Sequence, residues 1–132
     1  MAAINNARLA IQENLPGGNV RADVTCQIRF DQLELFLMQN GLRFRLDCKL
    51  WGSDSILNPD DDLFTYPRKS FPDGTPSLVE NVSFSAVMRS STLNEDDYIG
   101  NREDEIYGKL ILRRSDNNVK ISKKTNQIDH HF

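Results

Sequence analysis

The feature that most constrains this fold is a strict alternation of apolar and polar residues over residues 42–50. Leucine, phenylalanine and cysteine occupy every second position there, and arginine, aspartate and lysine occupy the positions between them. Successive side chains of a β-strand point to opposite faces, so the pattern predicts a strand with one face in a core and the other in solvent. A helix would repeat its apolar residues every three to four positions instead.

The same period of two recurs along most of the chain. It predicts further strands over residues 24–30, 82–88, 106–114 and 119–128. The proline- and glycine-rich stretch between residues 52 and 77 is too long for a structureless connection in a compact domain, so we also expect a short strand near 63–66.

One connection carries a specific turn signal. Leu33, Leu35 and Leu37 continue the alternation after Phe30, and Asn40-Gly41 follows them. Asn-Gly favours the positive φ angles of a two-residue hairpin turn. We therefore expect the strand from residue 24 to extend, with a bulge, to about residue 37 and to pair with residues 42–50.

Together these strands predict an all-β fold, an antiparallel β-sandwich of about seven strands with a short N-terminal arm. The length of 132 residues fits one domain. Residues 1–20 are polar and fit at best a weak helix or an extended segment, so we assign them to the arm and residues 21–132 to a single β-sandwich domain. We expect the arm to dock on its own domain or on a partner.

The charges are unevenly distributed. The formal net charge is −3, which argues against a general nucleic-acid binder, because such proteins are usually basic. Acidic residues concentrate within residues 52–62 and 91–105, whereas residues 109–124 are basic. One acidic end and one basic face would suit head-to-tail contact with copies of the chain or with partners, although both could also be solvated surfaces.

The two acidic segments repeat the theme Leu-Asn-X-Asp-Asp, at residues 57–61 and 93–97. Ca²⁺ takes roughly six to eight oxygen ligands, and a strand near 63–66 would bring both segments to one end of the sandwich. The arrangement resembles that of C2-type domains, in which acidic loops at one end of a sandwich bind Ca²⁺; the resemblance is one of architecture. Turn-forming surface loops, or helical turns capped by Asn58 and Asn94, are the alternative interpretation. The candidate ligands are Asp54, Asp60, Asp61, Asp62, Asn94, Asp96, Asp97 and Asp104.

We expect no catalytic activity. The only histidines are His130 and His131, at the end of the chain, and no motif of a nucleophilic or nucleotide-binding enzyme occurs. The sequence thus predicts a non-catalytic structural or interaction module, a subunit of a larger protein assembly, that uses its N-terminal arm and charged loop ends for contacts. The alternative is a calcium-dependent C2-like binding module that holds the ion between acidic loops 52–62 and 91–105.

The expected partners are proteins or copies of the chain itself, with no nucleic acid, no membrane and no cofactor other than Ca²⁺. No apolar run is long enough to span a bilayer, and the first residues lack the pattern of a secretory signal. We therefore expect a cytoplasmic protein, or part of an assembly built in the cytoplasm.

Overall fold

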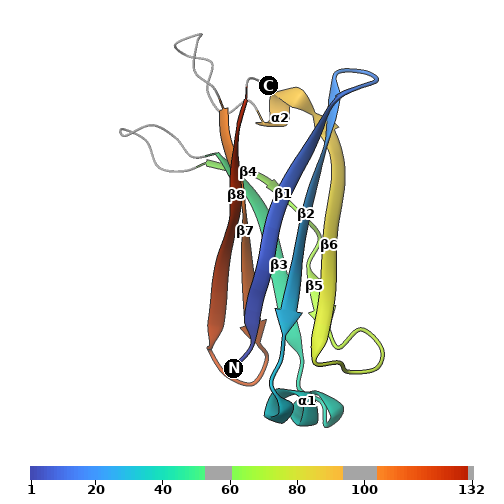
Figure 1. Ribbon diagram of the computed structural model, residues 1–132, viewed down its shortest axis with the longest axis vertical. Coiled ribbons are helices and arrows are strands. Elements are labelled where there is room, and N and C mark those ends of the chain that lie inside the picture. Colours follow the sequence, from blue (N-terminus) through green and yellow to red (C-terminus); the bar gives the residue numbers. More distant parts are fainter. Residues whose placement is uncertain (53–60, 94–103, 131–132) are drawn as a thin grey trace.

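The computed structural model describes residues 1–52, 61–93 and 104–130. Within them the chain forms two antiparallel β-sheets that face one another (Figure 1), which confirms the predicted all-β sandwich. The elements in chain order are β1 (Ala3–Leu15), β2 (Asn19–Arg29), α1 (Gln32–Gln39), β3 (Phe44–Gly52), β4 (Asp61–Thr65), β5 (Lys69–Phe71), β6 (Val79–Arg89), α2 (Ser90–Leu93), β7 (Asp104–Arg114) and β8 (Lys120–His130).

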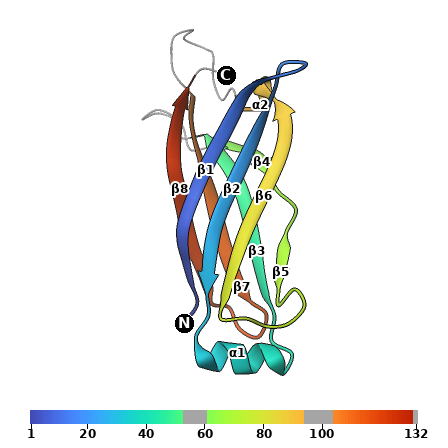
Figure 2. The same ribbon diagram turned by 45° about the vertical axis from the view of Figure 1, so that its right-hand side comes forward.

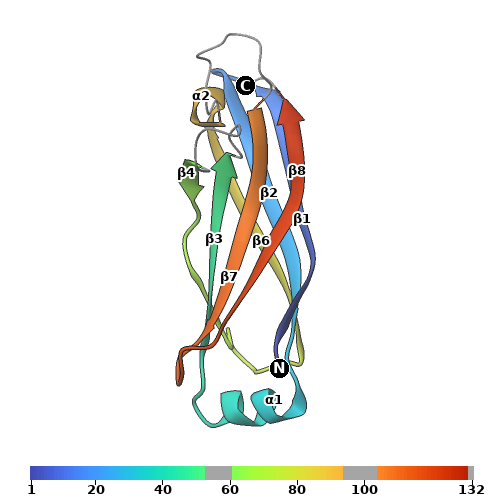
Figure 3. The same ribbon diagram turned by 90° about the vertical axis from the view of Figure 1, so that its left-hand side faces the viewer.

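The two sheets differ in size and strand order. The smaller sheet has the order β1-β2-β6 (Figure 2). The larger sheet has the order β4-β3-β7-β8 (Figure 3). β5 pairs with β3 on the edge that β4 also uses. The chain therefore crosses between sheets after β2, and α1 covers one end of the sandwich at this crossing (Figure 1).

The core lies between the inner faces of the two sheets. The apolar residues of the 42–50 segment are buried, whereas the residues between them are exposed or half-buried, so the strand predicted from the alternation is confirmed. Val24 and Ile28 of β2 and Leu110 and Leu112 of β7 are at most 1% exposed. Burying such side chains contributes roughly 1.5–3 kcal/mol each, which makes this layer the main source of stability.

Residues 32–39 form helix α1, so the strand and hairpin predicted for this region are wrong. Asp31 caps the helix: its side chain accepts a hydrogen bond from Glu34 N at 2.7 Å, and the Glu34 side chain accepts one from Asp31 N at 2.9 Å. This reciprocal pair gives acceptors to two backbone N–H groups at the helix start, Asp31 N and Glu34 N. The leucine side chains, which suggested a strand, have no acceptor to offer these groups. Gly41, at φ +108°, lies just beyond the helix, where a left-handed residue is common.

Residues 3–15 form the edge strand β1, so most of the segment predicted as an arm belongs to the smaller sheet. Ile4 and Leu9 are 4% and 3% exposed, which explains why the segment docks on its own domain. The positive φ angles of Asn6 (54°) and Asn14 (61°) accompany two register shifts against β2. These irregularities interrupt the period of two and hide the strand from sequence reasoning.

The outer edge of β1 meets β8 of the other sheet. Leu9 N donates to Asn126 Oδ1 at 2.8 Å, and Asn126 Nδ2 donates to Leu9 O at 3.1 Å. Further along, His130 Nε2 lies against Glu13 Oε1. Side chains of β8 thus occupy part of the free edge of β1. At these positions the edge cannot pair with a further strand.

Candidate functional site

Most of the predicted calcium ligands lie outside the described residues. These are Asp54, Asp60, Asn94, Asp96 and Asp97, together with the side chains of Asp61 and Asp104, whose backbones begin β4 and β7. Asp62 is described: it is exposed, and its Oδ2 lies 3.1 Å from Lys49 Nζ. Among the described residues, no three histidine, cysteine, aspartate or glutamate side chains gather as ligands for a metal.

The strand pairing does place the flanks of the two acidic segments together. Gly52 at the end of β3 pairs with Asp61 at the start of β4 and with Ile106 near the start of β7. The described ends of both segments therefore lie at the same end of the larger sheet, opposite α1 (Figure 1). The short strand expected near 63–66 is present as β4 and produces this arrangement.

A second cluster of charge lies on the outer face of the larger sheet. Arg45 of β3 pairs directly with Arg113 of β7, and Arg113 pairs with Lys120 of β8. Directly paired residues share a face of the sheet, and all three side chains are exposed. They form a row of three cations across three strands.

A parallel row lies four residues further along. Lys49 of β3 pairs with Lys109 of β7, which pairs with Lys124 of β8. Lys124 Nζ lies 4.7 Å from the centre of the Tyr107 ring, so this cation covers an aromatic side chain on the same face. We call the two rows together with Arg68 the basic face.

Two carboxylates partly neutralise the basic face. Asp47 lies between the rows, and its oxygens accept from Arg68 Nε at 2.7 Å and from Arg113 Nη1 at 2.5 Å. The hydrogen bond to Asp47 raises the pKa of Arg68, so this guanidinium stays charged. Asp62 pairs with Lys49. Among the described residues, the seven cations of the basic face are paired with only these two carboxylates, so this described part of the surface carries a net positive charge.

The row nearest α1 borders a cleft of about 430 Å³, which we call the basic cleft. Among the described residues, the side chains of Arg45 and Lys120 form no hydrogen bond or ion pair. Arg114 pairs with Asp116 at 2.8 Å, and this hydrogen bond raises the pKa of Arg114. The cleft is lined by Arg45, Arg68, Arg113, Arg114, Ser115, Asn117, Asn118, Val119 and Lys120.

Sequence reasoning found part of this surface. It located the basic residues of 109–124 and the outward positions of Arg45 and Lys49, but it did not place them side by side. The pairing of β3 with β7 joins residues about sixty positions apart, and the chain carries no local signal for it. The capping pair Asp31 and Glu34, which defines α1, was a local signal that was missed.

Comparisons with known proteins add little. No protein-family model and no curated protein matches the sequence. Among solved structures, the chain is similar to the "X-ray structure of Northeast Structural Genomics Consortium target SoR45", with 7% identity and a TM-score of 0.37 over 99% of this chain and 84% of that one. A TM-score this low supports no conclusion about function. None of the helices in the described part of the chain has the length and apolar character needed to cross a membrane.

Proposed function

We propose that this protein is a non-catalytic interaction module, a subunit of a larger assembly, that binds an acidic protein surface through its basic face. The observation that carries the proposal is the row Arg45–Arg113–Lys120, in which like charges lie directly opposite one another on adjacent strands. Such pairs destabilise a sheet by a few tenths of a kcal/mol each. A partner that supplies carboxylates would remove this repulsion and gain charge-assisted hydrogen bonds.

The overall charge favours an acidic protein over a nucleic acid. The chain is net acidic, at −3, so a long polyanion would be attracted by one face and repelled by the rest of the molecule. A folded partner can present its acidic patch to the basic face alone. Complementary patches of this kind raise association rates and fix the orientation of docking.

The test is binding of fluorescein-labelled poly-glutamate, measured by fluorescence anisotropy across a salt titration. The variant Arg45→Glu/Lys120→Glu reverses two cations that form no ion pair among the described residues. Arg29→Glu/Arg89→Glu is the matched control: it makes the same change in net charge on exposed positions of the smaller sheet. We expect roughly tenfold or greater weakening from the first pair only.

Three outcomes contradict the proposal. The wild-type protein could fail to bind at low salt, the two double variants could weaken binding equally, or a nucleic acid of equal charge could bind more tightly than poly-glutamate. Far-UV circular dichroism of each variant establishes that the sandwich is intact.

A second candidate function follows from the acidic end. The shared position of Gly52, Asp61 and Ile106 supports a calcium-dependent module, because it brings the flanks of both acidic segments together. Such a module gains stability when Ca²⁺ is added, by an amount that grows with ion concentration. A rise in Tm with CaCl₂ that MgCl₂ does not reproduce and that chelator reverses is the expected result, and an unchanged Tm at millimolar Ca²⁺ excludes this function.

A further inference from the structure

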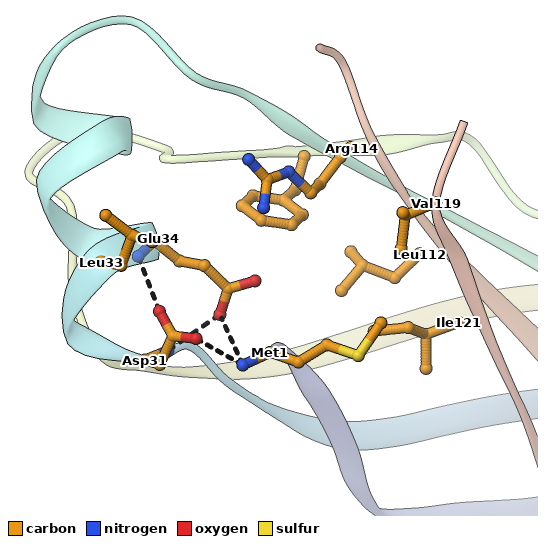
Figure 4. Close-up of a pocket in the computed structure, with 9 residues that line it drawn as sticks. Met1, Asp31, Leu33, Glu34, Leu112, Arg114, Val119 and Ile121 are labelled. Carbon is orange, nitrogen blue, oxygen red and sulfur yellow. Dashed lines mark hydrogen bonds and ion pairs between the residues drawn. The ribbon is translucent and has the colours of Figure 1, made fainter. Parts of the chain in front are cut away.

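An apolar pocket opens at the α1 end of the sandwich, beside the basic cleft. Its volume is about 240 Å³, and its walls come from α1, β3, β7, β8 and the start of the chain (Figure 4). Ligand pockets usually measure about 300–1,000 Å³, so this one suits a single bulky side chain better than a whole small molecule. We call it the apolar pocket; it is lined by Met1, Asp31, Leu33, Glu34, Phe44, Leu112, Arg114, Val119 and Ile121.

Exposed apolar side chains surround the apolar pocket. Helix α1 buries Glu34 (3% exposed) together with Met38, and it exposes the apolar residues Leu33 (64%) and Phe36 (58%). Val119, 38% exposed, lies on the pocket wall. Leu33 and Val119 line the same pocket, and exposed apolar side chains that gather at one place on a folded domain mark a surface that contacts another molecule.

The apolar pocket and the basic cleft adjoin, because Arg114 and Val119 line both. A ligand that fills both must carry a bulky apolar side chain with carboxylates close to it in sequence. This chain contains such a segment: Leu57 is followed by Asn58 and Pro59 and then by the consecutive aspartates 60–62. The repeat at Leu93 does not qualify, because Leu93 is 0% exposed in the core.

We propose that the apolar pocket and the basic cleft bind the segment 57–61 of a second copy of this chain, with Leu57 in the pocket and Asp60 and Asp61 in the cleft. This inference rests on the proposed function, and it identifies the acidic partner as a second copy of the chain. Charge complementarity argues for this occupant, since the basic face has excess cations and the segment ends in two successive acids. Asp62, the next residue, is already paired with Lys49 of its own molecule. Three residues of extended chain span about 10 Å, which suits two adjoining cavities.

Chain length makes the contact intermolecular. β3 runs for nine residues from Phe44, at the α1 end, to Gly52, which corresponds to about 30 Å. Gly52 pairs with Asp61, so the eight residues between them start and finish at the far end and reach outward by at most about 14 Å. The segment of one molecule therefore cannot enter its own pocket. Docking onto a neighbour is a head-to-tail contact, which generates chains or rings of subunits.

Sedimentation velocity over protein concentrations from about 5 to about 500 µM at low salt tests the proposal. The wild-type protein should grow beyond twice its mass of 15.1 kDa as concentration rises. The pocket variant Val119→Glu and the segment variant Leu57→Ser/Asp60→Lys should each stay monomeric. The control Val87→Glu changes an exposed apolar residue of β6, 58% exposed and away from the pocket, and should assemble like the wild type.

Mixing the two defective variants gives the sharpest result. Each retains the half that the other has lost, so an equimolar mixture should form a one-to-one dimer and no larger species. A monomeric wild type, a mixture that stays monomeric, or an equal loss of assembly in Val87→Glu overturns the proposal. If the wild type is monomeric but still binds poly-glutamate through Arg45 and Lys120, this inference fails alone; if that binding is also insensitive to Arg45 and Lys120, the proposed function fails as well.

Discussion

Replacing Glu34 is expected to loosen helix α1 while leaving the sandwich core intact. The side chain is 3% exposed, and each carboxylate oxygen accepts a backbone hydrogen bond: Oε1 from Asp31 N and Oε2 from Ala2 N, both at 2.9 Å. The N-terminal amine also lies 3.8 Å from Oε1. Glu34 therefore joins the helix start, the preceding turn and the start of the chain at one buried point.

The magnitude follows from these two hydrogen bonds. A hydrogen bond to a charged acceptor contributes about 1.5–3 kcal/mol net, and a buried donor left without an acceptor costs a similar amount. Since Asp31 N is only partly buried, water can replace part of one bond. We expect Glu34→Ala to lower the free energy of unfolding by about 3 kcal/mol and Glu34→Gln, which keeps one acceptor oxygen, by about 1–2 kcal/mol.

Urea unfolding measures both variants, with the single tryptophan, Trp51, as the fluorescent probe. Trp51 lies near the end of β3 that is remote from α1, so a shifted midpoint with an unchanged m-value reports global stability. If Glu34→Ala and Glu34→Gln destabilise equally, or if the alanine variant loses less than about 0.5 kcal/mol, the buried carboxylate does not hold α1 as argued.

Three further predictions concern the same sandwich. Tyr66→Phe should cost about 1–2 kcal/mol in urea unfolding, because the buried hydroxyl donates to Ala22 O at 2.8 Å, and a loss below about 0.3 kcal/mol contradicts this. Burial raises the pKa of Cys26 to about 11 and that of Cys48 to about 12, above the ordinary 9.0. Both thiols should stay inert to thiol reagents in the folded protein. Their contribution to the free energy of unfolding should be fully present below pH 9.0 and should be lost as the pH rises through the two folded pKa values, by a few kcal/mol in all. Urea unfolding at a series of pH values from neutral to alkaline checks this. A hydrogen bond from the N-terminal amine lowers the pKa of Asp31, so its stabilising contribution should be present at neutral pH and lost as pH falls through the folded value, and Asp31→Asn should remove that part of the acid transition.

The parts of the fold that could be predicted are those in which one strand face is buried and the other is not. In residues 44–52 burial alternates without interruption, so the apolar pattern and the structure agree position by position. The short strand β4 was also predictable, because a loop of that length needs internal structure. Its presence fixes the direction of the neighbouring strands and thereby the shared end of the acidic flanks.

The elements that could not be predicted are those in which the local backbone conformation or a helix cap overrides the alternation of apolar and polar residues. In β1 the left-handed residues Asn6 and Asn14 shift the register and break the alternation. In α1 three leucines spaced by two residues imitate a strand, whereas the Asp31 and Glu34 side chains satisfy the helix start. Two hydrogen bonds at a helix terminus outweigh a weak period of two over seven residues.

That single error about residues 31–41 also hid the candidate site. A two-residue turn at Asn40-Gly41 would have paired residues 42–50 with the strand before them, so Arg45 would have lain opposite Phe36 and not beside Arg113. Because α1 carries the chain across the end of the sandwich instead, β3 enters the other sheet and pairs with β7. The alternation determines which side chains face outward, but the crossing determines which charges become neighbours. The basic face therefore depends on strand order. If β3 paired with β2 instead of β7, the cations of β3 and β7 would no longer lie side by side, even with the alternation within each strand unchanged.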